Sequence, residues 1–198
     1  MREKTTRDHI IKAADQLFYQ QGFEHTSFAD IAGVVQVSRG NFYYHFKSKD
    51  EILDAVINVR LADRQVMLKQ WEVDGETPLD RIYSFINILI MNQEKIIKFG
   101  CPIGTLSTEL SKLNHASQND ANKLFTLFRT WLCRQFTLLG READADDLAM
   151  HLLARSQGVA TLATAFRDGE FIKKEVQLMC DWVKSQALET TAAQRSIH

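Results

Sequence analysis

The sequence predicts an all-α protein of about nine helices, arranged as a small N-terminal head and a larger helical body. Apolar residues recur at the three- and four-residue spacing of amphipathic helices along most of the 198-residue chain, and the alternation typical of strands is absent. Only two prolines and nine glycines interrupt this pattern. The hydrophobic fraction of 45% is that of a globular protein with a packed core and is too high for a disordered chain.

Three short helices are expected at the N-terminal end. The first covers about residues 5–21, and Gly22 supplies its C-terminal stop. Ser27 caps the second helix, and Asp30 follows three residues later in the spacing of a capping box. Ser38 caps a short third helix. Three helices so close together, two of them capped by serine, predict a compact three-helix unit.

Longer helices follow. A further capping-box pattern that begins at Ser48 opens a fourth helix, which is expected to run to about Trp71. Pro78 suits the first position of a fifth helix, and the apolar pattern continues from there to about Phe99. The remaining helices are expected over about 105–113, 117–139, 144–167 and 170–188, before a frayed polar tail at 190–198.

This pattern predicts two domains, a head over residues 1–47 and a body over residues 48–198. The formal net charge of the chain is −1, so the overall charge does not indicate a nucleic-acid partner. The distribution of charge is more informative, because residues 36–49 contain three cations and no acid. A positive surface of this size suits a domain that contacts a few phosphates.

The cysteines and the apolar segments narrow the class of protein. Cys101, Cys133 and Cys180 are widely spaced and form no C-x-x-C pair, which argues against a disulfide framework or a zinc site. The first residues lead into no apolar signal segment, and the longest apolar stretch, residues 82–91, is too short to span a bilayer. We therefore expect a cytoplasmic protein with no metal, no cofactor and no membrane partner.

Residues 38–49 are the most informative segment of the chain. They combine four aromatic rings, a histidine and three cations with no acid. A short helix that lies against DNA needs rings to hold it to its own domain and donors that reach phosphates and base edges. Gly40 supports this interpretation, because glycine inside a helix costs about 1 kcal/mol relative to alanine and a close approach to DNA would explain it. The segment predicts the recognition helix of a helix-turn-helix domain.

Three ordered segments resemble the TetR family of bacterial one-component transcriptional regulators. They are TSFADIA at residues 26–32, VSRGNFYYHF at 37–46 and KDEIL at 49–53. The resemblance covers residues 5 to about 55, and the body matches the family only in length and helical character. It implies repression by binding of double-stranded operator DNA, release by a small-molecule inducer of unknown identity, and a homodimer.

The resemblance implies major-groove contacts for the start of the third helix. These residues are Ser38, Arg39, Gly40 and Asn41. Arg39 could donate two hydrogen bonds to a guanine, and Asn41 could recognise an adenine or a phosphate. Both would equally suit an exposed surface without base contacts.

Contacts to the DNA backbone are implied for a second group. Tyr43 and His45 resemble the phosphate-contacting pair of the family, and Lys49 resembles its cation at the start of the fourth helix. Ser27 marks a helix N-terminus whose amides would point at a phosphate. Tyr44 could also reach the DNA backbone through its hydroxyl. The rings expected to pack inside the head are Phe42, Tyr44 and Phe46.

For the body, the resemblance implies an inducer pocket and a four-helix bundle formed by the last two helices of both subunits. Broad apolar stripes on these helices agree with a second surface to bury, although they would also suit a bundle within one chain. The residues expected in the dimer interface are Leu152, Val159, Leu162, Phe166, Ile172, Val176, Met179 and Val183. The residues expected to line the pocket, or else to form ordinary core, are Phe85, Met91, Phe99, Cys101, Phe128 and Trp131.

Other functions are weaker alternatives. Cys101 lies between Gly100 and Pro102, where one helix ends and another begins, so the same scaffold could serve as a thiol sensor of electrophiles or oxidants. A helical interaction module without DNA binding would leave the composition of residues 38–49 unexplained. Motifs for a catalytic serine, a phosphate loop or a dinucleotide site are absent from the sequence, so an enzyme is not expected.

Overall fold

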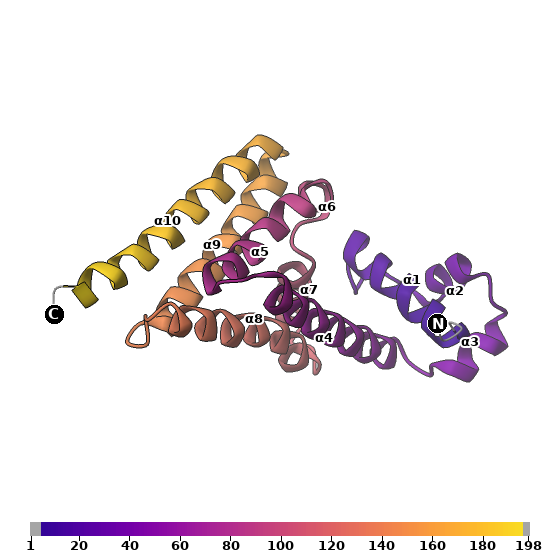
Figure 1. The fold of residues 1–198 in the computed structure, drawn as a ribbon. Coiled ribbons are helices and arrows are strands. Elements are labelled where there is room, and N and C mark those ends of the chain that lie inside the picture. The colour runs from indigo at the N-terminus through magenta and orange to yellow at the C-terminus, as the bar shows by residue number, and fades with distance from the viewer. Residues whose placement is uncertain (1–4, 196–198) are drawn as a thin grey trace. The chain divides into compact units, whose positions relative to one another are not determined.

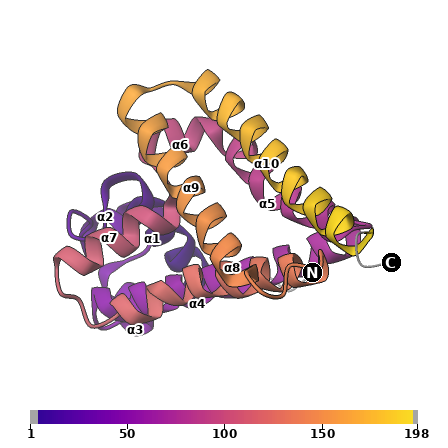
Figure 2. The same ribbon diagram turned by 90° about the vertical axis from the view of Figure 1, so that its left-hand side faces the viewer.

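The computed structural model describes the backbone of residues 5–195 and the side chains of residues 5–187. The described backbone forms helices and contains no strand (Figures 1 and 2), which confirms the predicted all-α class. The helices are α1 (Thr6–Gln21), α2 (Phe28–Val35), α3 (Arg39–His45), α4 (Lys49–Asp74), α5 (Pro78–Met91), α6 (Gln93–Phe99), α7 (Pro102–Lys112), α8 (Gln118–Leu138), α9 (Ala145–Phe166) and α10 (Gly169–Arg195).

The observed helices differ most from the prediction in two places. The single helix expected from Pro78 to Phe99 is interrupted at Asn92, whose ψ of 13° is not helical. Its side-chain amide donates to the Ile88 carbonyl at 2.9 Å, the kind of local bond by which asparagine competes with helix continuation. At the C-terminal end, residues 190–195 were expected to belong to a frayed polar tail. This prediction is wrong, because α10 extends to Arg195.

The chain folds into two compact units. Unit 1 contains the residues up to Arg64 together with Pro102–Leu124, and unit 2 contains Gln65–Cys101 together with the residues from Phe125 onward. Helices α4 and α8 each contribute to both units, because each crosses a unit boundary. The division expected at residue 47 does not coincide with a boundary between these units, and as a division between a DNA-binding head and a body it stays a prediction.

Unit 1 has a continuous apolar core to which α1, α2, α3, the first part of α4 and α7 all contribute. Arg60 of α4 is buried at the edge of this core. It donates through Nε to Asp15 Oδ1 of α1 at 2.6 Å and through Nη1 to the Pro102 carbonyl at the start of α7 at 2.7 Å. The large buried side chains of this core include Ile10, Ile11, Phe18, Phe23, Ile31, Phe42, Phe46, Ile52, Leu53, Ile57, Leu106 and Leu110.

In unit 2, α10 packs along α5 and α9, and α6 packs on α9 (Figures 1 and 2). Ile172 and Met179 of α10 are fully buried. The Thr164 hydroxyl of α9 donates to the Ile96 carbonyl of α6 at 2.7 Å and so fixes the short helix. The Arg155 guanidinium pairs with Glu175 at 2.9 Å across α9 and α10.

The connection between α1 and α2 depends on a glycine. Gly22 ends α1, as predicted, with φ 92° and ψ 157°, a region of backbone space that is essentially restricted to glycine. A Cβ atom at this position would lie 2.9 Å from Oε1 of Glu109 on α7. That carboxylate accepts hydrogen bonds from the next two backbone amides of the loop, so it has little freedom to move away.

We expect Gly22→Ala to lower the free energy of unfolding by about 1–3 kcal/mol, through backbone strain and displacement of Glu109. Gly33→Ala is the control, because Gly33 lies on an exposed part of α2 where an added Cβ would meet nothing within 4 Å. That control should raise stability by up to about 1 kcal/mol. Urea unfolding measures both; an unchanged midpoint for Gly22→Ala would contradict the role given to this glycine.

Candidate nucleic-acid interface

Helix α3 is two-sided. The Ser38 hydroxyl caps it by accepting from the Asn41 amide at 3.3 Å. Phe42 of α3 and Phe46, which directly follows the helix, are buried in the unit 1 core, as predicted. The polar start of the helix, with Ser38 and residues 39–41, is exposed. Two buried rings therefore fix the helix while its N-terminal end stays available for contacts outside the chain.

The tyrosines of α3 have different environments. Tyr43 is half-buried, and its ring lies edge-on to Phe28 with centroids 5.5 Å apart. The Arg39 guanidinium lies 5.7 Å from the centre of the Tyr43 ring, which orients a long side chain near the helix start. Tyr44 is 79% exposed, so its expected packing role is wrong and its hydroxyl is free to reach a partner. His45 is half-buried and lies edge-on to Tyr44 at 5.2 Å.

A surface groove of about 660 Å³ lies between α2 and α3. Its lining is mainly apolar and includes Ser27, Arg39 and Tyr43. The tertiary structure thus brings these three expected contacts, from two helices, onto one surface. The other lining residues are Phe28, Ala29, Ala32, Gly33, Gln36, Val37 and Phe42.

The N-terminus of α2 is closed by a reciprocal cap. The Asp30 amide donates to the Ser27 hydroxyl at 3.2 Å, and the Ser27 amide donates to Asp30 Oδ2 at 2.8 Å. The Ser27 hydroxyl also donates to Asp30, and these bonds hold the pKa of the Asp30 carboxyl below its ordinary value. The intervening first-turn amides of Phe28 and Ala29 have no acceptor within their own helix. They form the donor pair that a phosphate could use.

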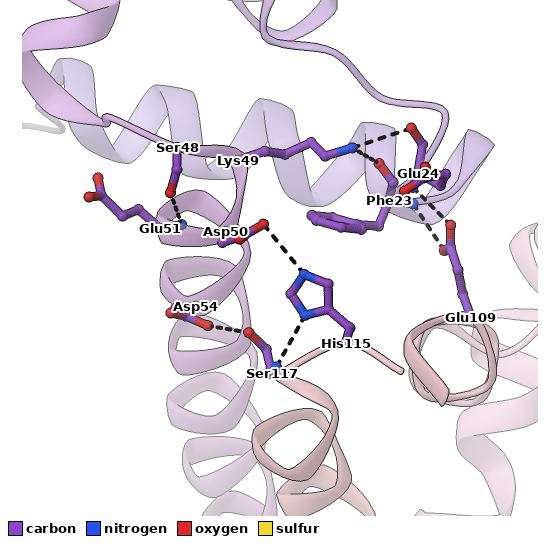
Figure 3. Close-up of polar contacts among 10 residues, drawn as sticks. All are labelled: Phe23, Glu24, Ser48, Lys49, Asp50, Glu51, Asp54, Glu109, His115 and Ser117. Carbon is purple, nitrogen blue, oxygen red and sulfur yellow. Dashed lines mark hydrogen bonds and ion pairs between the residues drawn. The ribbon is translucent and has the colours of Figure 1, made fainter. Parts of the chain in front are cut away.

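Lys49 has an internal partner that the sequence did not indicate. Figure 3 shows its ammonium directed at the α1–α2 loop, where it donates to the carbonyls of Phe23 at 2.9 Å and Glu24 at 3.2 Å. The same ammonium lies 4.2 Å from the centre of the Phe23 ring. Its expected contact to a DNA phosphate stays a prediction, beside a structural role within unit 1.

Sequence reasoning also missed Glu109 and His115, which contact the head from α7 and the loop after it. Glu109 Oε2 accepts from the Phe23 amide and Oε1 from the Glu24 amide, each at 2.9 Å (Figure 3). His115 Nδ1 accepts from the Ser117 amide at 3.1 Å, and its Nε2 lies 3.4 Å from an Asp50 carboxylate oxygen. The contacts of Glu109 with Phe23 and of His115 with Asp50 join residues 86 and 65 positions apart, so no local pattern marks them.

The residues expected to line an inducer pocket lie in different environments of unit 2. Phe85 and Phe128 are buried, and their rings lie 5.5 Å apart. Trp131 is buried, and its Nε1 donates to Glu72 at 2.7 Å. Met91 is 79% exposed. The expected pocket members Phe99 and Cys101 are half-buried.

Gln135 is a further residue that the sequence did not single out. It is fully buried on α8, one turn beyond Trp131, and neither end of its carboxamide has a partner among the described residues. Leaving a buried polar group without a partner costs about 1–3 kcal/mol. In the spacing of a helix, Gln135 faces the same side as Phe128 and Trp131.

The expected dimer residues divide into two groups. Leu162 and Phe166 of α9 are exposed, Phe166 by 74%. The other six lie inside unit 2, where they form the contacts among its own helices. The apolar stripes therefore serve mainly the subunit core, which is the alternative that the sequence left open. The buried members are Leu152, Val159, Ile172, Val176, Met179 and Val183.

Among the described residues, His, Cys, Asp and Glu side chains form no group that could hold a metal ion. The three cysteines, all within the described range, are half-buried and form no disulfide with one another, and burial raises the pKa of the Cys180 thiol. No helix in this part of the chain has the length and apolar character needed to cross a membrane. A special reactivity of Cys101 stays a prediction.

Comparison with known proteins agrees with this arrangement. Residues 10–56 match the family model of bacterial regulatory proteins of the tetR family. An uncharacterised HTH-type transcriptional regulator from the lacX 3′ region of Lactococcus lactis subsp. lactis is 28% identical, over 89% of this chain and 92% of its own. The HTH-type transcriptional repressor DhaR of Mycobacterium sp. (strain GP1) is also 28% identical, over 78% of this chain and 77% of its own.

A solved structure extends this similarity from the sequence to the whole fold. The TetR transcriptional regulator from Legionella pneumophila superposes with a TM-score of 0.79 at 25% identity, over 90% of this chain and 97% of that one. The family match covers the capped α2, the whole of α3 and the start of α4. The exposed N-terminal end of α3, the family match and these relatives together show that the chain belongs to the TetR family of bacterial transcriptional regulators.

Proposed function

We propose that this regulator is a cytoplasmic repressor that binds a pseudo-palindromic operator as a homodimer and leaves it when a small molecule binds unit 2. The observation that carries the proposal is the exposed start of α3. Arg39 and Asn41 project from a helix that Phe42 and Phe46 fix to the unit 1 core. Such a helix can enter a major groove without reorganising its own domain.

The charge distribution supports the DNA partner. Residues 36–49 contain three cations and no acid, although the whole chain has a net charge of −1. A local positive surface provides the phosphate contacts that supply much of the affinity for DNA, and two such surfaces in a dimer multiply it. The relative DhaR is named a transcriptional repressor, which supports repression as the mode of regulation.

The proposed dimer uses the exposed apolar part of α9. Leu162 and Phe166 lie one turn apart, and Met150 is a further exposed apolar residue of this helix. Leu178 is exposed on the neighbouring α10. Leu162 and Phe166 share one face of α9, and their exposure favours burial against a second copy, because large exposed apolar side chains that adjoin one another are uncommon on monomers. A twofold arrangement would present two recognition helices to an inverted repeat.

The proposed inducer site lies in the aromatic core of unit 2. Phe85, Phe128 and Trp131 provide buried aromatic surface, and Gln135 provides an amide with no partner among the described residues. A ligand that suits this environment is a mainly apolar aromatic molecule with one donor or acceptor for Gln135. Its binding would favour a conformation of unit 2 in which the protein has low affinity for DNA.

A gel-shift titration of the purified protein against the DNA upstream of its own gene tests the proposed function. We expect a specific complex that an excess of unrelated DNA does not displace. Half-sites should be separated by about one helical turn, roughly 10 bp, or a small multiple of it. Failure to select any sequence from a random duplex library would contradict the proposal.

We expect Arg39→Ala to relax the sequence preference at one position in each half-site, at a cost of roughly 1–3 kcal/mol for the preferred base. The reason is the loss of the exposed guanidinium that lies beside Tyr43. Selection from a randomised operator library measures the preference. An unchanged preferred sequence would mean that Arg39 contacts no base.

Gly40→Ala should raise the stability of the free protein by up to about 1 kcal/mol and weaken operator binding. A Cβ at this exposed helical position meets nothing within 4 Å in the free protein, so packing does not require the glycine. Close approach of DNA would require it. Thermal unfolding and gel shift are measured on the same sample, and operator affinity equal to that of the wild type would contradict this explanation.

Phe166→Asp should shift the protein toward monomer at micromolar concentration and weaken operator binding, because it places a charge in the proposed interface. Met91→Asp is the matched control, since Met91 is an equally exposed apolar residue on α5. Sedimentation velocity measures both. A wild-type protein that is monomeric under these conditions and still binds operator tightly would contradict the dimer.

A further inference from the structure

Two side chains of opposite charge hold the same two residues of the α1–α2 loop. Glu109 accepts from the amides of Phe23 and Glu24, each at 2.9 Å. Lys49 donates to the carbonyls of the same two residues, at 2.9 and 3.2 Å. All four backbone polar groups of Phe23 and Glu24 are thus satisfied by one carboxylate and one ammonium (Figure 3). We call this arrangement the loop clamp.

The loop clamp has strong interactions because both partners are charged. Hydrogen bonds to ionised groups are roughly twice as strong as neutral ones. The Phe23 ring is buried between Lys49 at 4.2 Å, His115 at 5.0 Å and Phe18 at 5.3 Å, so the loop is fixed through both backbone and side chain.

The loop clamp determines where α2 begins. Two residues after Glu24, the buried Thr26 donates to the Gly22 carbonyl at 2.7 Å and closes the loop. Ser27 follows at once as the cap of α2. The first-turn amides of α2, which lie beside the groove shared with α3, therefore have their position set by Phe23 and Glu24.

Helix α7 carries the Glu109 half of the loop clamp and is anchored at its start and by the loop after its end. At its start, the Pro102 carbonyl accepts from Arg60 of α4 at 2.7 Å. After its end, Ser117 donates to Asp54 of α4 at 2.8 Å. Pro102, the first residue of α7, directly follows Cys101, which ends the segment Gln65–Cys101 of unit 2. A change in unit 2 can reach α7 through this peptide bond, and Glu109 is the point at which α7 grips the loop.

We propose that Glu109 is a positioning residue for DNA binding, and that the loop clamp transmits the position of α7 to the N-terminus of α2. In this proposal, a displacement of α7 withdraws the Glu109 carboxylate from the two amides and lets the start of α2 move out of register with a phosphate. The proposal rests on operator binding as the proposed function. In the same proposal, Lys49 supports DNA binding by holding the α1–α2 loop and not by contacting a phosphate.

The two roles of Lys49 predict different results in a double-mutant cycle. We compare Glu109→Gln, Lys49→Met and the double variant for operator affinity over a range of salt concentrations. If both act through one loop, each single variant weakens operator binding by about tenfold or more, and the double variant is little worse than either. The log–log salt slope of Lys49→Met then equals that of the wild type.

Independent action gives a different pattern. If Lys49 contacts a phosphate, its removal lowers the salt slope by about one, and the losses of the two single variants multiply in the double variant. That result overturns the shared loop clamp. The control pair is Asp120→Asn and Lys123→Met, an exposed ion pair of unit 1 that lies near the start of α8 and does not contact the loop. Both controls should bind operator like the wild type.

Amide hydrogen exchange tests the loop clamp independently of the proposed operator binding. In the free protein, Glu109→Gln should speed exchange at residues 22–28 selectively, while the rest of α1 exchanges as in the wild type. If the wild-type protein binds no DNA, the proposed function is wrong, even if Glu109→Gln speeds exchange in the loop. Conversely, a Glu109→Gln variant that lowers the unfolding temperature but keeps both operator affinity and loop protection gives Glu109 a purely stabilising role and overturns the proposal.

Discussion

The constraint on which unit 1 depends is the satisfaction of the backbone at Phe23 and Glu24. The chain leaves α1 through a glycine conformation and must supply partners for the polar groups of the next two residues, one of which is buried. Those partners come from α4 and α7, far away in sequence. One loop of the head therefore joins two helices, and its geometry is inseparable from theirs.

The surface that we propose to bind DNA depends on a similar set of fixed contacts. Phe42 and Phe46 hold α3 to the core, and the caps at Ser27 and Ser38 set where α2 and α3 begin. Rigid anchoring of this kind lets exposed side chains act without large loss of conformational entropy on binding. Tyr44 illustrates the division, since it lies between two buried rings in sequence and is nevertheless exposed.

Local chemistry made several features predictable. The predicted caps at Ser27 and at Ser48 depend on residues three positions apart. In the structure, Ser27 forms a reciprocal capping box with Asp30, and the Ser48 hydroxyl accepts from the Glu51 amide at 3.1 Å. The segment at residues 38–49 was recognisable because its rings and donors fall within one short helix and the residues that follow it. The interruption at Asn92 was missed, because the apolar pattern continues across it while the backbone does not.

The sequence by itself determined the helical class and most of the helix starts, and it marked residues 38–49 as the predicted recognition helix, because each of these depends on side chains within a few residues of one another. Only the tertiary structure decided which partner each surface has. Periodicity marks an apolar face without naming what covers it, so Met179 and Val183, expected in a dimer, lie in the subunit core. Likewise, Glu109 acquires its role only because folding brings α7 to the α1–α2 loop, an approach between residues 86 positions apart that no local pattern encodes.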